Sequence, residues 1–458
     1  IYRRFRERLS SLGMAYNGMV QRAAADRIRG GGFAFPEPRR YVVAGFNALS
    51  ECEKRLFGFL ATAAETDFYW DYDSYYKDDP EQKAGMFVRS NVAQFPPRTE
   101  LRHDNMRGEK QIVSVAAVSN AVQCKYAAAI LAGLARRRRE EDPGIAAGAR
   151  PAAMPGSSSL RRRARPALGK ETAVVLTDEN LLLPLLYALP ADIGRVNVTM
   201  GFPLRQSLAY TFVERLVELQ NHRRRKGDGC TFYHADVAGI LAHPYVAECD
   251  AALTRTMHEE IVRDRRISVD AAWLGRNELL KRIFTPAATW RELSDYMLDV
   301  VAAVARQPYE GDDARQRVEF LAVIAEQVTK LRNSLDECDI DLTAEVYTSL
   351  LRRHLQTLRI PFEGEPLEGI QIMGILETRN LDFENVIILS MNDDNFPGNH
   401  MAQASFIPCN LRAAYELPTP EHHEGVYAYY FYRLIQRAKT VHMLYCSCLL
   451  YTSPSPRD

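Results

Sequence analysis

The sequence predicts an α/β protein in which two parallel-sheet domains follow each other and a long block of helices interrupts the second. Short apolar runs rich in Val and Ile alternate with helical segments over residues 1–139, and the alternation resumes after residue 171. Between residues 204 and 361 strand signals nearly vanish, and amphipathic segments such as 317–335 take over. Residues 140–170 are rich in Pro, Gly, Ala, Ser and Arg, which indicates a flexible linker or surface loop.

The first α/β region contains three strand candidates and the helices that would connect them. It opens with an amphipathic helical pattern over residues 1–23. The strand candidates are residues 41–46, 67–72 and 111–119, and the helix candidates are residues 51–64 and 122–139. Because strands that alternate with helices form parallel sheets, we expect a parallel sheet in this region.

The second α/β region is predicted in two pieces. Residues 171–203 hold a strand, a helix and a further strand, and residues 362–447 resume the pattern after the helical block. In the second piece, residues 370–376 and 386–391 are short, continuous apolar runs, as expected of strands buried on both faces of a parallel sheet. The charged loop between them, residues 377–384, should lie at the sheet edge where α/β proteins bind ligands.

This loop offers polar side chains to a ligand and apolar side chains to the core. Arg379 can make a charge-assisted contact with a phosphate, and Asn380 can donate from its side-chain amide. Leu381 and Phe383 are expected to anchor the loop in the core. The alternative for Arg379 is a surface ion pair with a neighbouring carboxylate. The alternative for the whole segment is a plain strand-loop-strand of another α/β fold.

Composition and charge narrow the class of protein. Of 458 residues, 47% are hydrophobic and 25% are charged, and no apolar run approaches the roughly 20 residues of a membrane helix, so we expect a soluble chain of two or three domains. The 58 Lys and Arg residues balance the 58 Asp and Glu residues, so a nucleic-acid surface would be a local patch. The eight cysteines form no CxxC pair, which argues against a zinc module or a disulfide framework and favours a reducing cytoplasm.

Residues 370–397 resemble motif V of the UvrD-like superfamily 1 DNA helicases. That motif runs His-x-x-Lys-Gly-Leu-Glu-Phe and is followed by a buried strand and an acidic turn that ends in Phe-Pro. Its positions are matched without a gap by Leu376, Arg379, Asn380, Leu381, Asp382 and Phe383, and the turn is closed by Phe396 and Pro397. The resemblance implies tandem RecA-like (P-loop NTPase-like) domains, with residues 1–139 as the C-terminal part of the first, residues 171–203 and 362–447 as the second, and residues 204–361 as its helical insertion.

Two further segments resemble helicase motifs but lack the residues that serve the nucleotide. Residues 41–60 resemble motif II, where Gly45 and Phe46 stand in place of the Asp-Glu pair that holds magnesium. Neither side chain supplies a carboxylate oxygen, so the metal-dependent step is expected to be lost. In the segment that resembles motif IV, Thr177 and Asp178 replace an arginine that reaches the nucleotide, and an anion site would not tolerate that exchange.

A third segment, residues 424–445, resembles motif VI. Arg437 matches the arginine finger of that motif. The phosphate-binding pattern GxxxxGK[ST] does not occur in these residues, and its usual position would lie upstream of residue 1. No cofactor is therefore expected in this part of the protein.

The wider resemblance is carried by the blocks FNALSECEKRLFGFL, FYWDYDSYY, VNVTMGFPL, PFEGEPLEGIQIMGILETRNLDFENVIILS and YAYYFYRLIQRA. Over nearly all of residues 1–447 the chain resembles AddB-like bacterial proteins of the PD-(D/E)XK nuclease family. This implies a DNA-binding subunit that processes double-strand-break ends for recombinational repair in the bacterial cytoplasm, with an AddA-like motor and nuclease partner. The exonuclease domain and its Mg²⁺ would follow this region. Residues 448–458 resemble a translated sequencing adapter and are excluded from the fold prediction.

The candidate DNA contacts are two groups of polar residues. One is the loop pair Arg379 and Asn380, and the other is the basic run Arg223, Arg224 and Arg225. Arg and Lys hold single strands or duplex ends mainly through their phosphates. No residue is nominated as catalytic or as a metal ligand. Asp71 and Asp73 alternate at a strand end, and an exposed strand terminus explains them more simply than a cation site.

Three functions remain open at this point. The favoured one is a non-catalytic helicase-like scaffold that binds DNA and a motor partner. The first alternative is a fragment of an active ATP-dependent helicase, against which Gly45 and Phe46 argue. The second is an interaction module without a DNA role, against which only the resemblance argues.

Overall fold

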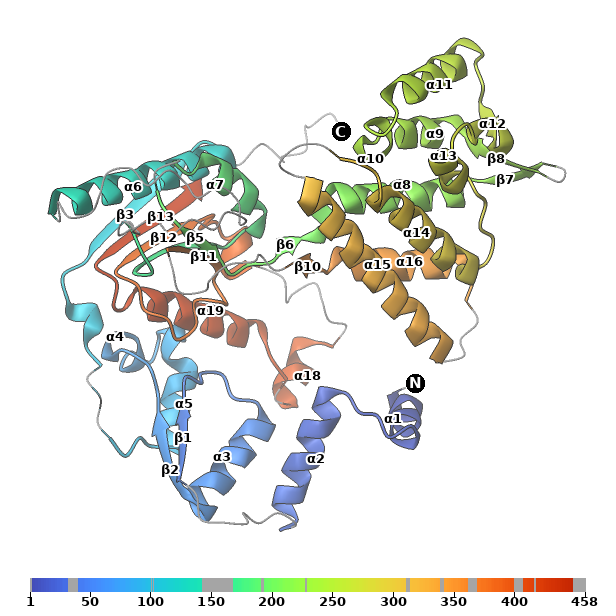
Figure 1. The fold of residues 1–458 in the computed structure, drawn as a ribbon. Helices are drawn as coiled ribbons and strands as arrows, with labels where there is room; N and C mark the ends of the chain where they lie inside the picture. The colour runs from blue at the N-terminus through green and yellow to red at the C-terminus, as the bar shows by residue number, and fades with distance from the viewer. Residues whose placement is uncertain are drawn as a thin grey trace, which may run out of the picture. The chain divides into compact units, whose positions relative to one another are not determined.

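The structure is a computed structural model (Figure 1). It describes residues 2–31, 40–99, 101, 103–141, 168–190, 193–226, 229–309, 314–337, 342–360, 369–398, 407–415 and 417–447. The chain forms two compact units, one built from Ile1–Met200 with Gly364–Asp458 and the other from Gly201–Glu363. Within the described ranges, no helix is both long enough and apolar enough to cross a membrane.

A six-stranded parallel sheet forms the centre of the first unit. Its strands follow the order β3-β13-β12-β4-β11-β5. Their bounds are β3 (Gln111–Ala117), β4 (Thr172–Leu176), β5 (Val196–Val198), β11 (Ile370–Gly374), β12 (Asn385–Leu389) and β13 (Thr440–Cys446). All neighbours are parallel, which confirms the predicted α/β class. The two apolar runs on either side of the charged loop, β11 and β12, both pair with β4.

The central strands are covered on both faces. β4 and β11 are buried along their whole length, as their continuous apolar sequences require. One face packs against α19 (Pro420–Ile435), where Val175 and Leu434 belong to one apolar cluster. On the other face lie α6 (Asn120–Glu141) and α7 (Leu182–Ala188) (Figure 1).

A separate pair of parallel strands, β1 (Arg40–Ala44) and β2 (Glu65–Tyr69), belongs to the same unit. Among the described residues, the other α-helices of the unit are α1 (Tyr2–Ser11), α2 (Asn17–Arg29), α3 (Glu51–Ala63), α4 (Ser74–Lys77), α5 (Met86–Gln94) and α18 (Cys409–Ala414). A capping box begins α3, and Phe57 of this helix contacts Phe68 of β2. Their cluster also includes Tyr429 of α19, so this helix packs against the strand pair as well as the six-stranded sheet.

β3 is not a partner of β1 and β2, although the sequence places all three in residues 1–139. It pairs with β13 along its whole length, and α6, which follows it, contacts the six-stranded sheet. The difference arises because a local apolar pattern identifies a strand but not a parallel partner so far along the chain. Most of the predicted linker, residues 142–167, and the tail at 448–458 lie outside the described residues.

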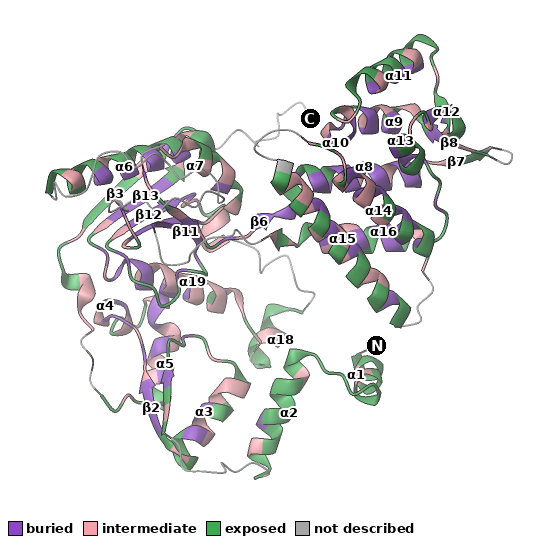
Figure 2. Cartoon of the chain, in the orientation of Figure 1, coloured by how far each residue is buried: buried purple, intermediate pink, exposed green. Residues whose placement is uncertain are grey.

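The second unit is mainly helical and covers the block in which the sequence has few strand signals. Its helices are α8 (Leu208–Asn221), α9 (His234–Leu241), α10 (Pro244–Ala247), α11 (Ala251–Arg263), α12 (Ala271–Leu274), α13 (Glu278–Ile283), α14 (Trp290–Ala305), α15 (Ala314–Glu337) and α16 (Ala344–Gln356). Side chains from α8, α14, α15 and α16 share one apolar core, and Figure 2 shows the buried residues along α8 and α14.

Short strands are also present in this unit. β7 (Arg224–Lys226), β8 (Gly229–Tyr233) and β9 (Ser268–Asp270) form an antiparallel sheet. β6 (Phe202–Pro203) pairs with β10 (Arg359–Ile360). Strands of two to five residues are too short to leave a clear alternating pattern in the sequence.

Candidate functional site

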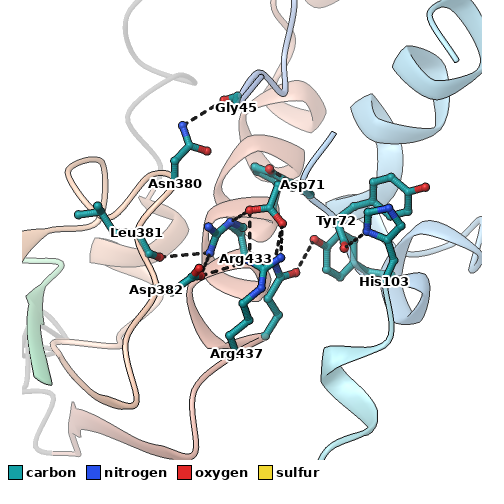
Figure 3. A network of polar contacts seen from close by, with 12 residues as sticks. Gly45, Asp71, Tyr72, His103, Asn380, Leu381, Asp382, Arg433 and Arg437 are labelled. Atoms are coloured by element: carbon teal, nitrogen blue, oxygen red, sulfur yellow. Dashed lines mark hydrogen bonds and ion pairs between the residues drawn. The ribbon is translucent and has the colours of Figure 1, made fainter. Parts of the chain in front are cut away.

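The loop after β11 contacts the end of β1. Asn380 in this loop has a positive φ of 59°, which asparagine tolerates better than most residues. Its side-chain amide donates a hydrogen bond of 3.3 Å to the carbonyl oxygen of Gly45 (Figure 3). Gly45 has a φ of 81°, and a Cβ there would come within 2.6 Å of the Asn380 Nδ2 atom. The backbone conformation therefore favours glycine at this position, and a Cβ would also push the Asn380 amide aside.

Two arginines at the end of α19 bridge two aspartates (Figure 3). Asp71 follows β2, and Asp382 ends the loop after β11. Arg437 makes ion pairs of 2.8 Å with Asp71 and 3.2 Å with Asp382. Arg433 pairs with Asp382 at 2.7 Å and also with Asp71. The Gln436 amide donates a further hydrogen bond of 2.9 Å to the Asp71 carboxylate, so this ion-pair network joins β2, the loop and α19.

Burial and charge oppose each other in the ion-pair network. Burial raises the pKa of Asp71, but the hydrogen bond from Arg437 and the charge of Arg433 outweigh it, so this pKa lies below its ordinary value of 3.8. Burial lowers the pKa of Arg437, and the two aspartates more than offset that effect, so its pKa lies above the ordinary value. Only 5% of the Arg433 side chain is exposed. The ionised Asp71 thus compensates a buried positive charge.

Asp71 and Asp73 are not the exposed strand-end residues that the sequence suggests. Asp73 is fully buried, caps α4 by accepting a hydrogen bond from the backbone N–H of Tyr75, and accepts a second one from the backbone N–H of Met106. No group of three or more His, Cys, Asp or Glu in the described residues is arranged to hold a metal ion. The sequence prediction also omits Arg433, although a spacing of four places it on the same side of a helix as Arg437.

Arg379 differs from the two arginines of the ion-pair network because it is exposed. Its Nε donates a hydrogen bond of 3.1 Å to the carbonyl oxygen of Leu376, and its guanidinium lies 5.8 Å from the ring centroid of Tyr430. No acidic side chain in the described ranges forms an ion pair with it, and Asp382 pairs with Arg433 and Arg437 instead. Among the described residues its remaining donors have no acceptor, so they can bind an anion from solution.

The two apolar residues of the loop differ in burial. Phe383 is 6% exposed and packs in the apolar cluster beneath α19, as predicted. Leu381 is 43% exposed, so the prediction that it anchors the loop is wrong. It contributes through its backbone, because its carbonyl oxygen accepts a hydrogen bond of 3.1 Å from Arg433. The sequence shows that this residue is apolar but not which way the turn directs its side chain.

A cavity of about 260 Å³ lies between the end of β1, the loop after β11 and α19. The residues that line it include Phe46, Asn47, Arg379, Asn380, Tyr430 and Arg433. The fold thus brings together the segments that resemble motif II, motif V and motif VI. Arg437, the residue expected to match the motif VI arginine, pairs with Asp71 and is not among these lining residues.

Thr177 and Asp178, the pair predicted to replace a motif IV arginine, have local structural roles at the end of β4. The Thr177 hydroxyl donates a hydrogen bond of 2.6 Å to the carbonyl oxygen of Ser390. The Asp178 carboxylate accepts one of 3.0 Å from the backbone N–H of Asn180 and caps the short helical turn that follows. Neither residue is among those that line the cavity.

The basic run at residues 223–225 belongs to the second unit, not to the unit that holds the cavity. Arg223 donates from its guanidinium to the carbonyl oxygen of Gln220 at 2.6 Å. Arg224 and Arg225 are exposed on β7. The two predicted groups of DNA contacts are therefore carried by different compact units.

No model of a known protein family matches the chain, and no curated protein matches its sequence. The chemistry of the site is therefore inferred from its own residues. These residues form three features. The first is the ion-pair network, whose charges satisfy one another, and the second is an exposed arginine without an acidic partner among the described residues. The third is the cavity that the arginine lines.

Proposed function

We propose that this chain is a non-catalytic, helicase-like scaffold that binds single-stranded DNA. The observation that carries the proposal is Arg379, an exposed arginine that lines the cavity and has no acidic partner in the described part of the chain. Its guanidinium lies next to the aromatic ring of Tyr430. A cation beside aromatic surface is the combination that holds a phosphate next to a stacked base. The similarity of the loop to motif V, which contacts the DNA backbone in helicases, supports the same role.

In this proposal the first unit contains parts of two RecA-like domains. β1 and β2 belong to the first, and the six-stranded sheet is the second. The second unit, Gly201–Glu363, is then a helical insertion in the second RecA-like domain. A parallel strand arrangement on each side of the cavity supports this assignment.

The lack of catalysis is inferred from two features of the same region. Gly45 and Phe46 offer no carboxylate oxygen to a metal ion. Arg437 already pairs with Asp71 and Asp382, so it would have to break both ion pairs before it could reach a phosphate. Both features favour a fixed contact between β2, the loop after β11 and α19 over a contact that changes when a nucleotide binds.

For the whole protein, we propose an AddB-like subunit that acts on DNA ends at double-strand breaks in the bacterial cytoplasm. An AddA-like motor and nuclease subunit is the partner implied by the resemblance. Exonuclease activity and its Mg²⁺ would belong to a PD-(D/E)XK domain other than the residues described here.

Titration of a labelled single-stranded oligonucleotide at several salt concentrations tests the DNA-binding role. Arg379→Ala should weaken binding by about 1 kcal/mol and reduce the salt slope by about one phosphate contact. Lys125→Ala is the matched control, because Lys125 is an exposed cation on α6 outside the cavity and should leave binding unchanged. Identical curves for all three proteins would exclude Arg379 as a contact, and no binding by the wild type would exclude the DNA role.

A steady-state ATPase assay, with and without single-stranded DNA, tests the absence of catalysis. We expect no turnover above background, and no effect of Arg437→Ala on that background, because the metal-binding carboxylates are missing. Turnover that Arg437→Ala abolishes would instead support a fragment of an active helicase.

A further inference from the structure

Asn47 lines the cavity but belongs neither to the ion-pair network nor to the predicted DNA contacts. It is 8% exposed, and both polar atoms of its side chain, Nδ2 and Oδ1, have no hydrogen-bond partner among the residues that the structure describes. Its backbone is held in place, because its carbonyl oxygen accepts a hydrogen bond of 2.6 Å from the buried Asn91. A buried amide without partners is destabilising, and native structures contain few of them. Within the described residues the hydrogen-bonding groups of this amide are unused, and the residue lines a cavity.

The chemistry of an amide restricts what that ligand can be. Asn47 presents one donor group and one acceptor side by side, so its partner must present an acceptor and a donor at the same spacing. Every nucleobase carries such a pair on its Watson–Crick edge. That edge is occupied in a duplex and free in a single strand. The amide thus favours an unpaired base, without preference for one of the four.

The neighbours of Asn47 fit the other parts of a nucleotide. Phe46 is 39% exposed, lines the same cavity, and packs edge to face against Phe57 with 5.1 Å between the ring centroids. An exposed aromatic ring provides a stacking surface for a base. Arg379 provides the cation for the adjoining phosphate.

The size and charge of the cavity agree with one base. Its volume of about 260 Å³ is below the roughly 300–1,000 Å³ of pockets that hold drug-sized ligands. One carboxylate, that of Glu53, also lines the cavity. It accepts a hydrogen bond of 2.7 Å from the backbone N–H of Ser50 at the start of α3, so it is already engaged. Arg433 is neutralised by its two aspartates, which leaves Arg379 as the cation for the strand.

We infer that this cavity captures one unpaired base of a DNA strand. Asn47 hydrogen-bonds its Watson–Crick edge, Phe46 stacks on its face, and Arg379 holds the neighbouring phosphate. The inference rests on the proposed function, because it specifies which part of a single strand the site recognises. It also explains why an aromatic residue stands where motif II has a carboxylate.

The test compares a short oligothymidine with an abasic sugar-phosphate strand of the same length and charge. The wild type should bind the base-containing strand about tenfold more tightly. Asn47→Leu should remove most of this difference and leave the affinity for the abasic strand unchanged. Arg379→Ala should weaken binding to both strands by a similar factor. Phe46→Leu, at an exposed position, should reduce the preference for bases independently of Asn47.

The outcomes separate base capture from DNA binding in general. Equal affinity of the wild type for both strands, with Arg379→Ala weakening both, would overturn base capture and leave the scaffold proposal intact. No binding to either strand would overturn both. An asparagine-containing peptide that binds in an Asn47-dependent manner, while bases have no effect, would assign the cavity to a peptide.

The melting temperature gives a separate test. Asn47→Leu should not lower it, since the lost amide has no partner among the described residues. A clear loss would mean that the amide is hydrogen-bonded within the fold.

Discussion

Asp71 joins the end of β2 to α19 through three polar contacts. It receives ion pairs from Arg433 and Arg437 and a hydrogen bond from Gln436. Only 22% of its side chain is exposed, against 50% for Asp382, the other acid of the network. The two aspartates therefore share both arginine partners but differ in their surroundings, and their removal should have unequal effects.

Asp71→Asn should lower the free energy of unfolding by about 2–4 kcal/mol, because Arg433 would keep its buried charge with only one half-exposed partner. Asp382→Asn is the matched control and should cost about 0–1 kcal/mol, because Asp71 still pairs with both arginines. Denaturant unfolding of the three proteins at neutral pH measures both values. Equal losses in the two variants would contradict the dominant role of Asp71.

The difference in stability between the wild type and Asp71→Asn should depend on pH. Because the folded-state pKa of Asp71 lies below 3.8, its ionised form contributes stability above that value, and the contribution is lost as the pH falls through the folded-state pKa. The difference between wild type and Asp71→Asn should stay constant above pH 3.8 and narrow below it. A difference that persists in acid would mean that lost packing, not lost charge, destabilises the variant.

Sequence reasoning identifies single residues of the site better than their partners. Arg379 and Arg437 follow from the positions of charged residues in recognisable segments. The roles of Asp71 and Asn47 cannot be predicted in this way, because an aspartate at a strand end and an asparagine in a loop are most often exposed. Their burial depends on α19 and α5, which approach from elsewhere in the chain. Whether a polar residue is buried is decided by tertiary packing, which no local pattern contains.

At the scale of secondary structure, the strands with the strongest local signals were the predictable ones. β4, β11 and β12 are continuous apolar runs, and burial on both faces of the sheet requires that composition. The partner of β3 was not predictable, since β13 and β1 are equally plausible from the sequence. The contact between Asn380 and Gly45 was not predictable either, because it depends on the loop after β11 meeting the end of β1. The elements of the site could thus be located in the sequence, but not their meeting point.

At the scale of the whole molecule, the second unit has the properties of an inserted domain. β6 and β10 pair antiparallel with Phe202 opposite Ile360, so its two ends lie side by side. Its apolar core runs from Leu204 to Leu355 and lies within the unit. A segment with its own core and adjacent ends can be inserted into another domain without disturbing it.

Residues 201–363 expressed alone should therefore fold into a helical domain that unfolds cooperatively on heating. The native core can be probed in this fragment by Leu321→Ala, which should cost about 2–5 kcal/mol because Leu321 is fully buried on α15. Val262→Ala is the matched control, since Val262 is 63% exposed on α11 and should change stability by less than about 0.5 kcal/mol. Circular dichroism and denaturant unfolding measure these effects. Helical signal without a cooperative transition, or equal effects of the two substitutions, would show that this core forms only within the complete chain.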